Sequence, residues 1–143
     1  MENVNFEREM PYSIEAEQSV IGSALSNVQS VASAAEVITP EDFYNSANRE
    51  IFSAILELFN ENSAIDIVTV SDKLAQRDKL EAIGGVRYLA EAAAAVPTTK
   101  HVAYYSNIIK EKAMLRKLIK AGNSICELAY SGSDETSRIL EQS

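Results

Sequence analysis

The stretch KHVAYYSNIIKEKAMLRKLIKAGNSICELAY, residues 100–130, decides the fold because it has the length and composition of one long helix. It contains no proline and a single glycine, Gly122. At about 100° per residue its apolar positions form two groups, roughly a third of a turn apart. The first group contains Val102, Tyr105, Ile108 and Ile109, and the second contains Leu115, Leu118, Gly122, Ile125 and Ala129. The pattern therefore predicts a helix whose two halves pack against different surfaces.

The residues near the N-terminus show how an earlier helix begins. Pro11 prevents a helix from starting sooner, and the Ser13 hydroxyl can cap a helix over about 14–26. Glu15 and Glu17 place negative charge in its first turn, where the helix dipole favours it. Local sequence alone therefore predicts this helix start.

Helical spacing continues along the rest of the chain. Further helices are predicted near residues 28–38, 40–44, 46–59, 66–80, 86–95 and 137–143. The run IDIVTV, residues 65–70, could form a strand on propensity alone, but there is no clear partner strand. A helix capped by Asp66 or Thr69 is the favoured interpretation. The Gly84 and Gly85 pair predicts a turn between helices, with one residue at positive φ.

Together these signals predict an all-α protein with a compact multi-helix head followed by a helical hairpin. We expect a flexible tail over residues 1–12, the head over 13–97, and the hairpin over 98–143, with its second arm cut short. A helix as short as the last one cannot bury much surface alone.

Composition restricts the class of protein. The chain has 143 residues, 46% of them hydrophobic, which is enough for a sizeable core, and a formal net charge of -8. That charge argues against a protein that coats DNA or lies on an anionic membrane. Cys126 is the only cysteine, so an internal disulfide is impossible, and no apolar run approaches the ~20 residues of a membrane span. A cytoplasmic location is expected.

Residues that would carry out catalysis are not evident. No stretch matches GxxxxGK[ST], the loop with which many ATPases hold phosphate. His101 is the only histidine and no local sequence pairs it with Cys126 or a serine, so a surface role is expected. The sequence therefore predicts neither an enzyme nor a bound cofactor or metal in this chain.

A basic stretch interrupts the acidic background. The long helix places five basic residues opposite its second apolar face: Lys110, Lys112, Arg116, Lys117 and Lys120. Three interpretations remain open: a solvated face, a site for an acidic surface on a partner or second copy, or a weak DNA contact. On the same helix, Ile125 and its flanking neighbour Ile119 add apolar area that a shortened hairpin arm cannot cover, which is typical of an association surface.

Five blocks of sequence, taken in order, resemble the N-terminal domain of the bacterial replicative DNA helicase, the DnaB family. They are PYSIEAEQSVIGSAL, ITPEDFY with REIFSAI, IDIVTVSDKL, LEAIGGVRYLAEAAAAVPT and VAYYSNIIKEKAMLRKLI. The resemblance covers about Pro11 to Tyr130. It implies a noncatalytic collar domain, a trimer of dimers above a ring of six ATPase motors. ATP and magnesium would then act in a motor domain absent from this chain, which we take for an N-terminal fragment.

The same resemblance implies partners: other copies of the chain, the helicase-binding domain of primase, and in some bacteria a helicase loader, with DNA contacted mainly by the full-length ring. We place the primase contact at Ile119 and Ile125 with Tyr88, although Tyr88 could equally be a core aromatic. Pairing between hairpins is expected to use Leu115 and Leu118, for which packing against Ile139 and Leu140 of the same chain would compete.

Two rival interpretations remain. The helicase-binding domain of primase resembles this fold and would lie on the other side of the same contact. An independent DNA-binding helical module would use Arg116, Lys117 and Lys120 for phosphate contacts.

Overall fold

The computed structural model describes residues 9–95, 101–132 and 140–141, and the regular elements in these ranges are helices. They are α1 (Ile14–Ser26), α2 (Val28–Ala35), the 3-10 helix η1 (Pro40–Asp42), α3 (Ser46–Asn60), α4 (Ile67–Gln76), α5 (Gly85–Ala94) and α6 (Val102–Ser131). The all-α prediction is confirmed. The strand alternative for residues 65–70 is wrong, because α4 begins at Ile67.

Side chains cap two helices where the sequence predicts it. The Ser13 hydroxyl accepts a hydrogen bond from the Ala16 amide at 3.2 Å, at the start of α1. The Asp66 carboxylate accepts from the Thr69 amide at 2.8 Å, and the Thr69 hydroxyl accepts from the Asp66 amide at 2.9 Å. This reciprocal capping box holds the entry of α4 and favours helix over strand there.

The core lies between α1, α2, α3 and the first half of α6. Ile21 of α1, Ile51 of α3 and Ile109 of α6 are almost completely buried, and each contributes about 1.5–3 kcal/mol through removal from water. The rings of Phe43 and Phe52 meet within this core, with centroids 4.9 Å apart. Helix α4 packs on α3, and α5 packs on α1 and α4.

The turn before α5 depends on two glycines. Gly84 has a φ of 107° and Gly85 a φ of 72°, so both lie in the left-handed region that favours glycine. The predicted turn is therefore present, with two residues at positive φ where one was expected. A Cβ atom at Gly84 would lie 3.0 Å from the Cβ of Tyr88, so this position is also closely packed.

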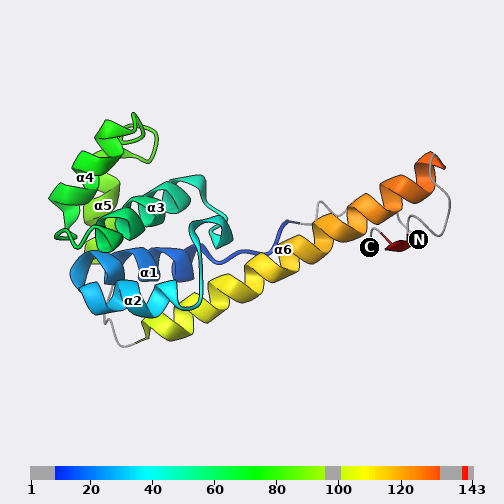
Figure 1. Cartoon of the computed structure of the whole chain (residues 1–143), viewed down its shortest axis with the longest axis horizontal. Helices are drawn as coiled ribbons and strands as arrows, with labels where there is room; N and C mark the ends of the chain where they lie inside the picture. The colour runs from blue at the N-terminus through cyan, green and yellow to red at the C-terminus, as the bar shows by residue number, and fades with distance from the viewer. Residues whose placement is uncertain (1–8, 96–100, 133–139, 142–143) are drawn as a thin grey trace.

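Helix α6 belongs to two environments. Its first half packs on α1, α2 and η1, whereas its second half extends past the other helices (Figure 1). The last buried residue of α6 is Arg116. We call residues 117–131 the arm, and we call residues 13–95 together with residues 102–116 the head. At 1.5 Å per residue the whole helix is about 45 Å long.

Two expected boundaries can be compared with the packing. The flexible tail over 1–12 stays a prediction, and at its last residues the Tyr12 ring stacks on Tyr44 at 4.5 Å and the Pro11 carbonyl accepts a hydrogen bond from Arg116. The predicted division between head and hairpin at residues 97 and 98 does not match the packing, because Val102 and Ile109 of the long helix are buried in the head core.

Candidate interaction surfaces

The arm and the last turn of α6 before it present apolar side chains to solvent. Leu118 is 67% exposed, and Met114, Leu115 and Ile119 are exposed beside it, while Ile125 is half-buried. A shallow apolar depression of about 360 Å³ is lined by Met114, Lys117, Leu118 and Ala121. These residues follow helical spacing, so they form one strip along the helix. An apolar strip on a projecting helix has the form of a surface for another protein.

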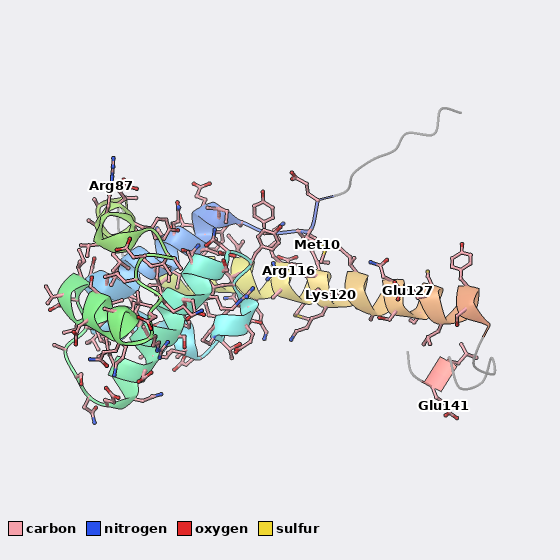
Figure 2. The ribbon with its side chains drawn as sticks, turned by 90° about the horizontal axis from the view of Figure 1, so that it is seen from above. Met10, Arg87, Arg116, Lys120, Glu127 and Glu141 are labelled. Carbon is pink, nitrogen blue, oxygen red and sulfur yellow. The ribbon has the colours of Figure 1, made fainter. Side chains whose placement is uncertain are left out.

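The basic residues of α6 divide at the exit from the head. Arg116 is only 8% exposed, and its guanidinium donates to the Pro11 carbonyl at 2.8 Å and the Asp42 carbonyl at 2.6 Å. Lys110 lies 3.5 Å from the Asp42 carboxylate. Figure 2 places Arg116 where α6 leaves the head and Lys120 farther along the arm. The expectation that Arg116 belongs to an open basic face is therefore wrong, because carbonyl oxygens from two distant segments enclose it.

Tyr88 of α5 ends a hydrogen-bond network inside the head. Its hydroxyl donates to the Asn48 side-chain oxygen at 2.6 Å and lies 3.5 Å from the Gln18 amide nitrogen. Asn48 in turn donates to the Glu17 carboxylate at 3.0 Å. Glu17 is buried and also accepts from the amides of Tyr44 and Asn45, at 2.7 and 3.2 Å. The network joins α1, α3 and α5 through one carboxylate.

A second set of charges lies on the outer side of α3 and α4. Lys73 lies 3.1 Å from Glu57 and 3.3 Å from Glu61, and Arg77 also pairs with Glu57. Hydrogen bonds from Arg77, and then from Lys73, lower the pKa of Glu57 from its ordinary value of 4.5. The Glu57 carboxylate raises the pKa of Lys73 from 10.5. This cluster holds two helices together and is separate from the arm.

The part of the chain that the structure describes contains neither a metal site nor a membrane span. In residues 9–95, 101–132 and 140–141, no group of three or more histidine, cysteine, aspartate or glutamate side chains is placed to bind a metal ion. Across the same ranges, no helix combines the length and apolarity needed to cross a lipid bilayer.

The sequence matches the model of the DnaB-like helicase N-terminal domain over residues 9–111. The chain belongs to this family. Among curated relatives it is 43% identical over 136 residues to the replicative DNA helicase DnaB of Geobacillus stearothermophilus, and the match covers 95% of this chain but only 30% of that protein. The assignment to the helicase, and not to primase, is therefore the correct one of the two related interpretations.

Solved structures of N-terminal domains of DnaB helicases have the same fold as this DnaB-like N-terminal domain. The crystal structure of the N-terminal domain of DnaB helicase from Mycobacterium tuberculosis superposes with a TM-score of 0.87, at 34% identity and 94% coverage of both chains. The N-terminal domain of DnaB helicase from Helicobacter pylori, described with its interactions with primase, has a TM-score of 0.68 and 25% identity, and the match covers 80% of this chain and 89% of that one.

The residues predicted for primase binding do not form one surface within a single copy. Ile119 and Ile125 lie on the arm, whereas Tyr88 lies in α5, and Figure 1 shows α5 at the far side of the head. Figure 2 likewise separates Arg87, the neighbour of Tyr88, from Glu127 on the arm. The hydrogen bonds of Tyr88 give it a structural role in the head. Its contact with a partner stays a prediction, as do those of the two isoleucines.

The predicted packing of Ile139 and Leu140 on Leu115 and Leu118 can be compared with the structure only for Leu140. Ile139 lies outside the described residues, and Leu140 is 69% exposed. Leu115 and Leu118 are exposed as well, so any packing of Leu140 on them buries none of the three side chains.

Sequence reasoning missed two features of these surfaces. Met114 belongs to the apolar strip, and its spacing of four residues from Leu118 is the signal that would have found it. The enclosure of Arg116 had no such signal, because its acceptors are backbone carbonyls 105 and 74 residues away.

Proposed function

We propose that this DnaB-like N-terminal domain is a noncatalytic scaffold of a replicative helicase, which joins copies of the chain into a ring and docks primase during DNA replication. The observation that carries the proposal is the arm: residues 117–131 continue α6 beyond the head with no buried side chain and with an apolar strip on one side. Exposed apolar surface of this kind is stabilised by association. In the proposal, ATP and Mg²⁺ act outside these 143 residues.

Association of copies is the first part of the proposal. Leu115 and Leu118, with Met114 beside them, supply the apolar strip, and we propose that two arms pair through it to form dimers, three of which complete a ring. Light scattering over a concentration series tests this part. A mass that rises toward the dimer or hexamer supports the proposal, and a monomer at every concentration contradicts it.

Primase docking is the second part. The described relation of the Helicobacter pylori domain to primase supports it, together with exposed Ile119 and half-buried Ile125 on the arm. We expect Ile119→Asp or Ile125→Asp to abolish binding of a primase C-terminal domain, because a carboxylate would enter an apolar contact. The matched control is Asn123→Asp, which adds the same charge at an exposed polar position of the same arm.

The binding experiment has a clear negative outcome. Far-UV circular dichroism should show unchanged helix content in all three variants, because the arm contributes no side chain to the core. Unchanged primase binding by both isoleucine variants would show that primase does not bind through these residues of the arm, whatever the result for self-association.

A further inference from the structure

The N-terminal residues 9–13 lie against the exit of α6 and are held there by few contacts. The Pro11 carbonyl accepts a hydrogen bond from Arg116 at 2.8 Å, and the Tyr12 ring stacks on Tyr44 with an interplanar angle of 7°. Beyond Tyr12 the chain enters α1, whose first turn Ser13 caps. Residues 11 and 12 therefore connect the start of α1 to the last buried turn of α6.

Arg116 and Tyr44 together hold this segment. The second terminal nitrogen of the Arg116 guanidinium donates to the Asp42 carbonyl at 2.6 Å. The central carbon of the guanidinium lies 5.4 Å from the centre of the Tyr44 ring, which is within cation–π range. Tyr44 thus contacts both Tyr12 and Arg116. A planar guanidinium suits this task because its fixed fork can bond two carbonyls at once while its face rests on a ring.

The two sides of this arrangement are not equally secure. The turn that carries Asp42 and Tyr44 is fixed from within the head, because the buried Glu17 carboxylate accepts hydrogen bonds from the backbone amides of Tyr44 and Asn45. By contrast, the stack of Tyr12 on Tyr44 lies at the surface, where Tyr12 is 36% and Tyr44 42% exposed. We therefore expect the contact with the N-terminal segment to open before the turn does.

Arg116 also marks a mechanical boundary in α6. Ala113 is the preceding buried residue, and after Arg116 no described residue of the helix is buried. If Arg116 were released, the packed length of α6 would shorten by about one turn, back to Ala113. Arg116 is thus the last residue through which the head anchors α6 before the arm begins.

We propose that residues 11–13 form a reversible strap, with Arg116 and Tyr44 as its catch, which sets the direction of the arm relative to the head. Arg116 is a positioning residue in this device: it touches no partner itself but fixes the helix that carries the apolar strip. The inference rests on the proposed function, since the direction of the arm decides how two copies, or a copy and primase, meet.

Electron-spin distance measurements test the strap directly. One label goes on native Cys126, which is exposed on the arm, and the second on a Val68→Cys substitution, at an exposed position in α4. The labelled chain is diluted into excess unlabelled Cys126→Ser chain, so that distances between copies do not contribute. The strap predicts a single narrow distribution of distances between arm and head.

Two variants with matched controls separate the strap from a general loss of structure. Arg116→Met should give a distribution about twice as wide, whereas Lys117→Met, which removes the same charge from the next residue, should not. Tyr12→Ala should broaden the distribution in the same way, and Tyr104→Ala, at another exposed tyrosine, should leave it narrow. Far-UV circular dichroism should show the same helix content throughout.

The result that would overturn the strap is a Tyr12→Ala distribution that superposes on that of the unmodified chain. This variant decides the matter even if Arg116→Met fails to fold, because Tyr12 lies at the surface. The measurement uses no primase, and the excess of unlabelled chain removes distances between labels on different copies. A chain that stays monomeric and ignores primase, yet broadens in both variants, would therefore refute the proposed function and leave the strap in place.

Discussion

The two halves of α6 are one continuous helix in two different surroundings. In residues 102–116 the side chains of Val102, Ile109 and Ala113 are buried within the head, and in residues 117–131 none is buried. Both halves carry apolar residues at helical spacing. The comparison teaches that periodicity shows which side chains share a face, whereas the extent of the neighbouring helices decides which of those faces is covered.

The largest expected effect contrasts a residue of each half. Ile109→Ala should lower the free energy of unfolding by about 2–5 kcal/mol, because it leaves a cavity in the core. Leu118→Ala should change it by less than about 0.5 kcal/mol, because this side chain is already in water. Urea unfolding followed by circular dichroism, at a concentration where the chain is monomeric, measures both. Equal losses would mean that the arm is packed in the single copy.

A polar version of the same contrast uses two glutamates. Glu17→Gln should lower the free energy of unfolding by about 1–3 kcal/mol. Both carboxylate oxygens of Glu17 accept hydrogen bonds, and in glutamine one of them becomes an NH₂ group, which cannot accept from the N–H donor that it faces. Glu127→Gln on the arm, where the side chain is exposed, should be close to neutral. Denaturant midpoints of the two variants give the answer. A neutral Glu17→Gln would show that the network does not depend on the charge.

Removing the Tyr88 hydroxyl from the same network should lower stability less than Glu17→Gln does. Tyr88→Phe removes the hydroxyl that donates to Asn48 and should cost about 1 kcal/mol, with Tyr130→Phe on the arm as the unaffected control. Thermal unfolding of both variants tests this. If Tyr88→Phe leaves stability unchanged but weakens primase binding, the prediction of Tyr88 as a contact residue gains support over its structural role.

The smallest effect concerns the charges between α3 and α4. The lowered pKa of Glu57 means that its contribution is present above its ordinary pKa of 4.5 and is lost as the pH falls through the lower folded value. The raised pKa of Lys73 means that its contribution is lost as the pH rises above 10.5 through the higher folded value. Stability of the unmodified chain and of Glu57→Gln, measured against pH, should differ at neutral pH and converge in acid. High salt should also reduce the difference, because these groups are solvated.

Local sequence was sufficient for much of the fold. Ser13 and Asp66 mark helix starts that the structure confirms, and the glycine pair at 84 and 85 forms the expected turn. Capping depends on residues three positions apart, so sequence alone can reveal it. Asn45, which caps α3 by accepting from the Asn48 amide, was not singled out, because asparagine is also common in ordinary turns.

The apolar residues of the arm could also be found from sequence, but their surroundings could not. Spacing alone placed Leu118 and Ile125 on one face of the helix, and the shortness of the last segment suggested that this face would remain open. Whether Tyr88 lay in the core or at a surface was undecidable, because its position depends on how α5 meets α1 and α3. The structure gives it a partly buried ring and a hydroxyl bonded to Asn48.

By itself, the sequence determined where helices begin, which side chains share a face and, through five ordered blocks, the family. Those properties depend on residues close together in the chain. Only the tertiary structure decided where α6 leaves the head, that residues 11 and 12 are held there, and that Arg116 is enclosed and not part of a basic face. The physical reason is that these features depend on backbone carbonyls and rings from distant segments, whose approach is set by the packing of the whole core.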